Sequence, residues 1–225
     1  MAILSEIVRF VLPTTRRSDF ARLCARLASH SAVRSQYFGP SIAVSLPILQ
    51  NEMCWMIQWR GARPPELQKL VAELSPDHAA TSLILTLDDS QATSLEKALE
   101  APICQFATIR LQDTAPISDP MLQHSMHKTF TDCYLADDGF IDGTWAYASN
   151  TNDVSGVSWT KTETTTEVDT RDRKLGIYAL GWTSRAAHDA YSKTSLFAEE
   201  IDKLQPWFAP GTGAWYVEFE KYDKE

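Results

Sequence analysis

The sequence contains five histidines, and histidine is the side chain that titrates near neutral pH without help. On a helix expected to start near Pro120, His127 and Tyr134 lie together at the edge of the apolar stripe, whereas His124 points outward. We therefore expect His127 to be a general base, placed where the helix meets the concave face of a sheet. A half-buried histidine satisfied by water or backbone would give the same pattern.

A second histidine, His188, precedes Tyr191 by three residues on a helix expected over residues 183–204. This spacing allows the two side chains to share a pocket rim, with His188 as the second candidate base. Either Tyr191 or Tyr134 would donate a hydrogen bond to a developing enolate oxygen. A solvated position on the helix surface is the commoner role for a histidine like His188.

Aromatic side chains are concentrated in the second half of the chain. Alternation along a strand expected over residues 140–148 places Trp145 and Tyr147 on one face with Gly143, which leaves space beside them. Most large aromatic side chains form core, but a flat phenolic ligand needs the same kind of surface. The candidate substrate-binding residues are Trp145, Tyr147, Tyr178, Trp182 and Phe197.

Two charged residues interrupt apolar strands. Arg9 lies in the first strand, and Asp142 lies on the opposite face of its strand from Trp145. Either could be a buried charge that anchors a ligand, although exposure at a sheet edge is the commoner explanation.

Several chemistries lack support in the sequence. His124 and His127 are spaced as two metal ligands on one helix could be, but no carboxylate or sulfur partner accompanies them, and the four cysteines form no C-x-x-C pair. Glycine-rich nucleotide motifs and G-x-S-x-G are absent. We expect buried free thiols, no metal and no cofactor.

Charge and hydropathy narrow the possible partners. The formal net charge of -8 disfavours nucleic acid as a partner. Glu6 and Arg9 break the apolar run at the start too early for a signal peptide, and no run reaches the length of a membrane helix. The sequence therefore predicts a soluble cytoplasmic protein that acts on a small molecule.

The order of the expected elements repeats itself along the chain. Strand-like and helix-like segments follow the order β-α-β-β-α-β twice, which predicts an α+β protein with ferredoxin-like repeats at residues 1–100 and 101–225. The expected strands cover residues 6–12, 36–45, 53–59 and 83–88 in the first copy and residues 103–111, 140–148, 178–182 and 215–220 in the second. We expect Ser18 or Asp19 to cap the first helix.

Two segments stand outside this repeat. Residues 89–101 join the copies and have the composition of a short helix. Residues 150–174 are rich in Thr, Asn and Asp, which fits either a functional lid or a polar hairpin that extends the flanking strands.

The pattern resembles the dimeric α+β barrel superfamily, which includes antibiotic biosynthesis monooxygenase-like and stress-responsive barrel proteins. The strand-Trp-helix elements at Trp59 and Trp182, together with Tyr191 and the element order over nearly the whole chain, carry the resemblance. It implies that the two repeats form an intrachain dimeric α+β barrel, with a further homodimer possible. Relatives act as polyketide cyclases, cofactor-independent quinol oxygenases, isomerases or haem-degrading enzymes, so the fold leaves the chemistry open.

The resemblance also bears on the candidate site. In plant barrel cyclases the last helix carries a tyrosine, matched here by Tyr191, and then a histidine, whose position Phe197 occupies. The base must therefore come from elsewhere. The leading hypothesis is a cofactor-independent cyclase or isomerase that acts by proton transfer on a polyketide-like or phenolic secondary metabolite. The alternatives are a cofactor-independent monooxygenase and a non-catalytic small-molecule binding protein.

Overall fold

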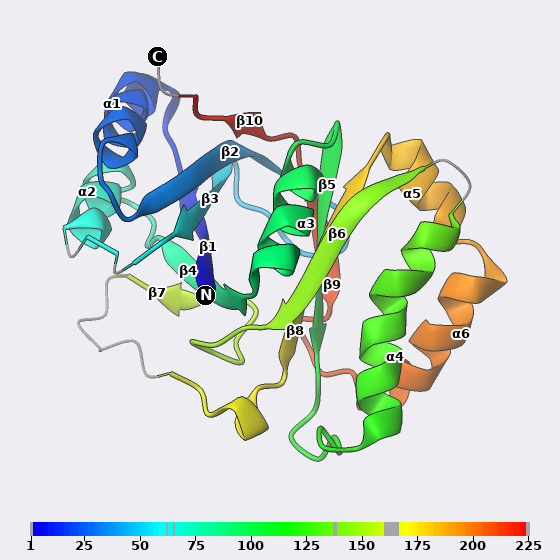
Figure 1. Ribbon diagram of the computed structural model, residues 1–225. Helices are drawn as coiled ribbons and strands as arrows, with labels where there is room; N and C mark the ends of the chain where they lie inside the picture. The colour runs from blue at the N-terminus through cyan, green and yellow to red at the C-terminus, as the bar shows by residue number, and fades with distance from the viewer. Residues whose placement is uncertain (1, 62, 65, 137–138, 160–166, 224–225) are drawn as a thin grey trace.

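The computed structural model describes residues 2–61, 63–64, 66–136, 139–159 and 167–223. Within these residues, the ten strands form one antiparallel sheet in the order β6-β8-β5-β9-β2-β3-β1-β4-β7, with β10 paired to β2. Helices cover this sheet at both ends of the molecule (Figure 1). The expected α+β class is therefore confirmed. None of the described helices has both the length and the apolar composition needed to cross a bilayer.

The first half of the chain contains four long strands and two helices. These are β1 (Ile3–Val11), α1 (Arg17–Ala28), β2 (Val33–Ala43), β3 (Glu52–Trp59), α2 (Leu67–Leu74) and β4 (Thr81–Leu87). Their sheet order is β2-β3-β1-β4, and every neighbouring pair is antiparallel.

The second half arranges its strands in the same relation, β6-β8-β5-β9. Its main elements are β5 (Ile103–Arg110), α4 (Pro120–Thr131), β6 (Phe140–Tyr147), β8 (Leu175–Trp182), α5 (Arg185–Tyr191), α6 (Ser195–Leu204) and β9 (Gly213–Val217). Short elements complete the chain: η1 (Thr14–Arg16), η2 (Asp132–Leu135), β7 (Val157–Ser158), η3 (Thr170–Asp172), η4 (Gln205–Trp207) and β10 (Glu220–Lys221).

Two seams join the halves. Along one seam β2 pairs with β9, so the sheet runs continuously from one half into the other. Along the other seam β4 and β6 meet at a single bridge between Leu85 and Ala148. The connecting helix α3 (Asp89–Leu99) packs on β6 and β8 and lies between the two halves (Figure 1). Asp88 begins it with a capping box, so the helix expected within residues 89–101 is confirmed.

A tryptophan closes the third strand of each half and donates a hydrogen bond back to the first strand. The indole Nε1 of Trp59 lies 3.1 Å from Oε2 of Glu6, and that of Trp182 lies 3.2 Å from Oε1 of Gln105. The registers agree, because Trp59 pairs with Leu4 and Trp182 with Ile103, each two residues before the acceptor. Both indoles therefore lie on the helix-covered face of their half, where a buried N–H needs an acceptor.

Two helix boundaries differ from expectation. The single helix expected over residues 183–204 is two helices, because Thr194 accepts a hydrogen bond from the backbone N–H of Phe197 and starts α6 as a new helix. The first helix is not capped by Ser18 or Asp19. It continues directly from the turn η1, and Asp19 lies inside it, paired with Arg16 and Arg22.

Residues 157–159 of the 150–174 segment pack on the first half. Val157 and Ser158 form β7, which pairs with the edge strand β4, and the backbone N–H of Trp159 donates to Ala80. Trp159 is buried, with the Arg63 guanidinium 5.2 Å from the centroid of its ring. A hairpin that extends the flanking strands is therefore wrong for these residues. The part of the expected lid at 160–166 lies outside the described residues.

Close packing of α3 against β8 generates a stability prediction. A Cβ added at Gly181 would lie 2.7 Å from the Cα of Ala98 and 2.9 Å from the Cβ of Ala101. We expect Gly181→Ala to lower the free energy of unfolding by about 1–3 kcal/mol, because backbone cannot rotate away. The control is Gly61→Ala, whose Cβ would have its nearest neighbour at 3.8 Å, with an expected effect within about 0.5 kcal/mol. Urea denaturation measures both, and equal effects would contradict the prediction.

Candidate functional site

His188 is held under α5, against the end of β8. Ser184 caps α5 by accepting a hydrogen bond from the backbone N–H of Ala187, which fixes the first turn on the sheet. The imidazole is 8% exposed and packs 5.2 Å from the Trp182 ring, and its Nδ1 lies 2.5 Å from the hydroxyl oxygen of Tyr216. The expected solvated position for His188 is therefore wrong, because the inner face of α5 rests on these two rings.

Burial controls the charge of this pair. Desolvation lowers the pKa of His188, and the carboxylate of Asp189, 3.6 Å from Nδ1, opposes that shift only in part. Burial, with a smaller contribution from Asp189, raises the pKa of Tyr216 to about 12. At neutral pH the imidazole is therefore uncharged and the phenol keeps its proton.

Tyr191 lies on the same face of α5, one turn beyond His188. Its ring is 5.5 Å from that of Trp182, and the side chain is 5% exposed. Among the described residues no hydrogen bond satisfies its hydroxyl. Burial raises the pKa of Tyr191, and the neighbouring Cys133 raises it further. The neutral imidazole of His188 and the unpaired hydroxyl-bearing ring of Tyr191 thus both pack against the Trp182 indole.

Phe197 and Gln105 contact these side chains. Phe197, at the start of α6, contacts the Tyr191 ring edge to face at 5.7 Å. Gln105 pairs with Tyr216 across β5 and β9 and accepts from the Trp182 indole. We call His188, Tyr191, Trp182, Tyr216 and Gln105 the Trp182 cluster.

A second group of predicted residues lies along α4 and β6. His127 is exposed, and its Nδ1 accepts a hydrogen bond of 3.1 Å from the Trp145 indole. Trp145 in turn stacks on Tyr178 at 5.4 Å, and the Tyr178 hydroxyl donates to the backbone oxygen of Met126 at 2.7 Å. The Tyr147 hydroxyl accepts from the amide of Gln123. His127 therefore lies on the solvent side of the aromatic layer, outside the expected pocket edge.

Tyr134 and Asp142 form a separate network. Tyr134 is 52% exposed, and its hydroxyl donates to Asp142 at 2.6 Å. Asp142 also accepts from Lys97 of α3 at 2.9 Å and is itself buried. Burial raises the pKa of Tyr134, and the hydrogen bond to Asp142 adds to the rise. The commoner explanation for Asp142, exposure at a sheet edge, is wrong.

The space expected beside Gly143 is filled. A Cβ at this position would lie 2.9 Å from Cδ2 of Leu180 and 3.1 Å from the Phe140 ring. Both side chains lean over the glycine from the same face. The aromatic hollow expected next to Trp145 and Tyr147 is therefore occupied by protein at this point.

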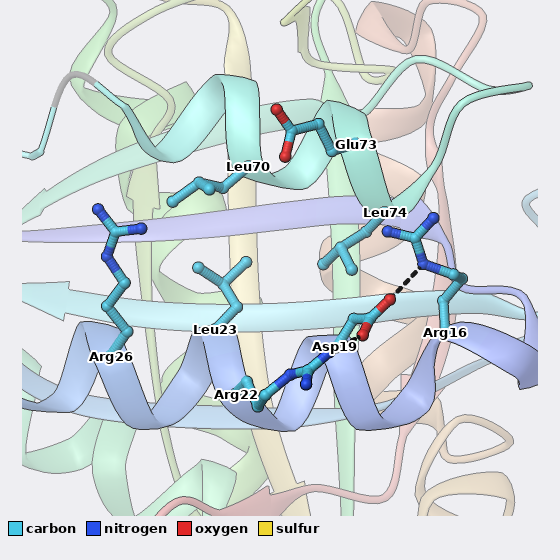
Figure 2. A pocket seen from close by; sticks show the side chains of 8 residues that line it. All are labelled: Arg16, Asp19, Arg22, Leu23, Arg26, Leu70, Glu73 and Leu74. Carbon is cyan, nitrogen blue, oxygen red and sulfur yellow. Dashed lines mark hydrogen bonds and ion pairs between the residues drawn. The ribbon is translucent and has the colours of Figure 1, made fainter.

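Cavities occur elsewhere on the described surface. One of about 350 Å³ lies between α1 and α2, where Arg16 and Arg22 pair with Asp19 and leucine side chains line the same pocket (Figure 2). Others measure about 390 Å³ where α1 meets β2 and β3, about 290 Å³ between α4 and α6, and about 200 Å³ beside Arg9. Neither His188 nor Tyr191 lines these four cavities, and both side chains are buried.

The described residues offer no cluster of potential metal ligands. In the part of the chain that the structure describes, no three His, Cys, Asp or Glu side chains converge as metal ligands do. The four cysteines are buried and unbridged, which confirms the expectation of free thiols.

Comparisons place the fold among known structures. No model of a known protein family matches the chain, and no curated protein matches it. The fold is similar to a "putative monooxygenase" from Lactobacillus acidophilus NCFM, with 9% identity, 97% of this chain and 94% of that chain covered, and a TM-score of 0.57. The fold is also similar to a protein from Fusobacterium nucleatum with the same description. The identity is 6%, 99% of this chain and 93% of that chain are covered, and the TM-score is 0.57.

An anthrone oxidase-like protein gives 8% identity, 98% and 92% coverage and a TM-score of 0.53. At these identities the likeness shows the fold alone. The fold is therefore the one found in monooxygenase-like α+β proteins, over nearly the full length of the chain.

Two members of the Trp182 cluster were not singled out from the sequence. Gln105 carries a readable signal, because it matches Glu6 once the two strand-ending tryptophans are aligned. Tyr216 carries none, since its contact with His188 depends on how α5 turns back over β9.

The buried, neutral His188 predicts a pH dependence of stability. An unfolded histidine has a pKa near 6.5, and the folded value is lower, so between the two the unfolded state binds more protons. Stability should therefore fall as the pH drops below about 6.5. We expect His188→Gln to remove this part of the slope, and His124→Gln, at an exposed position, to keep it. Thermal or urea unfolding from pH 7 to 5 measures the slope of stability against pH. Identical slopes for the wild-type protein, His188→Gln and His124→Gln would contradict the prediction.

Proposed function

We propose that this chain is an enzyme of the dimeric α+β barrel superfamily, built from a duplicated ferredoxin-like repeat at residues 1–100 and 101–225. The identical strand order of the two halves supports the duplication. The β2–β9 pairing on one side and the Leu85–Ala148 bridge on the other support an intrachain barrel. The similarity to monooxygenase-like folds over the whole length agrees with this proposal.

The activity that the geometry favours is cofactor-independent proton transfer on a polyketide-like or phenolic small molecule, as in a cyclase or isomerase. One observation carries this choice: the neutral imidazole of His188 and the unpaired hydroxyl of Tyr191 both rest on Trp182. His188 would remove a proton from a carbon beside a carbonyl group and later return it. Tyr191 would donate a hydrogen bond to the enolate oxygen that forms.

The surroundings suit a flat substrate. Aromatic rings flank the pair, and Trp182 would stack against an aromatic ligand while the closed layer excludes water. The short helix α5 is separated from α6 by residues 192–194, and its Tyr191 ring packs against Phe197 of α6. His127 remains a second candidate base, although its exposure and its hydrogen bond to Trp145 give it less control over a substrate. Tyr134 remains a second candidate donor.

A monooxygenase is the second candidate, favoured by the names of the similar structures. The same base would deprotonate a phenolic substrate, whose anion would then reduce dioxygen directly. A non-catalytic binding protein is the third candidate, because Phe197 occupies the position at which related cyclases carry a histidine.

Anthrone is a suitable probe for these candidates, since its C10 proton exchanges through the enol and its oxidation product gains one oxygen atom from dioxygen. We expect the protein to catalyse deuterium exchange at C10. His188→Gln should lower kcat/KM about 10²-fold or more and Tyr191→Phe about 10²-fold, while His124→Gln should leave it unchanged. Mass spectrometry of anthrone in deuterated water measures the exchange.

Each result decides between the candidates. Wild-type exchange in both variants would contradict the assignment of His188 and Tyr191. Label from ¹⁸O₂ in the product would establish the monooxygenase. Saturable anthrone binding without exchange or oxidation would establish the binding protein.

A further inference from the structure

A partly buried arginine on β1 faces Trp215 of β9, away from the Trp182 cluster. Arg9 follows Ile7 on the inward face of β1, and its side chain is 12% exposed. Its Nε donates to Oε1 of Glu52 at 2.8 Å, and its guanidinium lies 4.9 Å from the centroid of the Trp215 ring. Exposure at a sheet edge, the commoner explanation for Arg9, is therefore wrong.

The guanidinium retains donors that the protein does not use. Arginine has five N–H donors, and the bond to Glu52 uses one. Among the described residues, no hydrogen bond reaches either Nη atom, and neither of them belongs to the buried atoms that lack a partner. Arg9 also lines a cavity, which is where we expect the Nη groups to be available to a ligand. The indole face of Trp215 holds the guanidinium plane in place.

A cavity of about 200 Å³ adjoins this guanidinium. Most of its wall is apolar, with a few polar groups among its lining residues. The residues that the argument uses are Arg9, Val11, Pro47, Leu49, Glu52 and Thr81. Its volume is below that of pockets for drug-sized ligands, so only a compact molecule fits.

We propose that this cavity binds a small monocarboxylic acid with a compact apolar body, such as an aromatic acid. A planar guanidinium with free Nη donors recognises a carboxylate through two parallel hydrogen bonds. The apolar body lies against Val11, Pro47 and Leu49, and Thr81 and Ser155 are the further polar residues at the wall. Glu52 sets the affinity, because its negative charge beside Arg9 opposes a second anion.

This site is independent of the proposed function. Trp215 faces Arg9 on one side of the sheet, whereas the next residue of β9, Tyr216, faces His188 on the opposite, helix-covered side. A failure at Arg9 therefore leaves the assignment of His188 untouched, and the reverse also holds.

Calorimetry with benzoate as the probe, and benzamide as its neutral counterpart, tests the proposal on the full chain. We expect benzoate to bind at one site and benzamide not to bind. Arg9→Met should weaken benzoate binding at least tenfold. Arg9→Lys should also weaken it, because an ammonium group cannot donate two parallel hydrogen bonds to a carboxylate as a guanidinium does. Glu52→Gln should strengthen it several-fold, since the opposing charge is gone.

Opposite effects at two neighbouring residues separate a ligand site from a purely structural ion pair. The control is Arg22→Gln in the groove between α1 and α2, which should change nothing. If Arg9→Met does not fold, as circular dichroism would show, Arg9→Lys and Glu52→Gln still carry the test. The proposal would be overturned if benzoate did not bind to the wild-type protein or if benzamide bound equally well. It would also be overturned if the substitutions at Arg9 and Glu52 left the benzoate affinity unchanged.

Discussion

The hydrogen bond from the Trp182 indole to Gln105 is the interaction on which the proposed site depends. The indole is fully buried, so its N–H needs an acceptor, and Gln105 supplies one from the neighbouring strand β5. This hydrogen bond fixes the position of the Trp182 ring beneath α5. Because His188 and Tyr191 both pack on that ring, its position sets theirs.

In the first half, the buried indole N–H of Trp59 also needs an acceptor, and here the acceptor is a carboxylate. Glu6 takes the place of Gln105, and burial raises the pKa of its carboxyl although Arg63, at 2.6 Å, opposes the shift. Trp159 then covers Arg63 from the 150–174 segment. Glu6 and Arg63 are thereby paired with each other within the first half. The second half keeps a neutral acceptor, and the Tyr191 hydroxyl on the same indole has no hydrogen-bond partner among the described residues, which is why we place the proposed site there.

Much of the fold was readable from the sequence, because strands and helices impose regular periods on the apolar residues. The eight long strands, the connecting helix α3 and the start of α4 at Pro120 follow from such local signals. The break between α5 and α6 was missed because the apolar stripe continues through it, whereas the Thr194 cap acts through a hydrogen bond. The burial of His188 and the filling of the space at Gly143 depend on which distant side chains arrive there, and no local pattern encodes that.

A double-mutant cycle between Trp182 and Gln105 tests the central claim most directly. Urea unfolding of Trp182→Phe, Gln105→Met and the double variant gives the coupling free energy between the two side chains. The account predicts a favourable coupling of about 1 kcal/mol, the net value of a buried hydrogen bond. A coupling of zero would contradict it, because Trp182 would then be placed by packing alone and Gln105 would have no part in positioning the site.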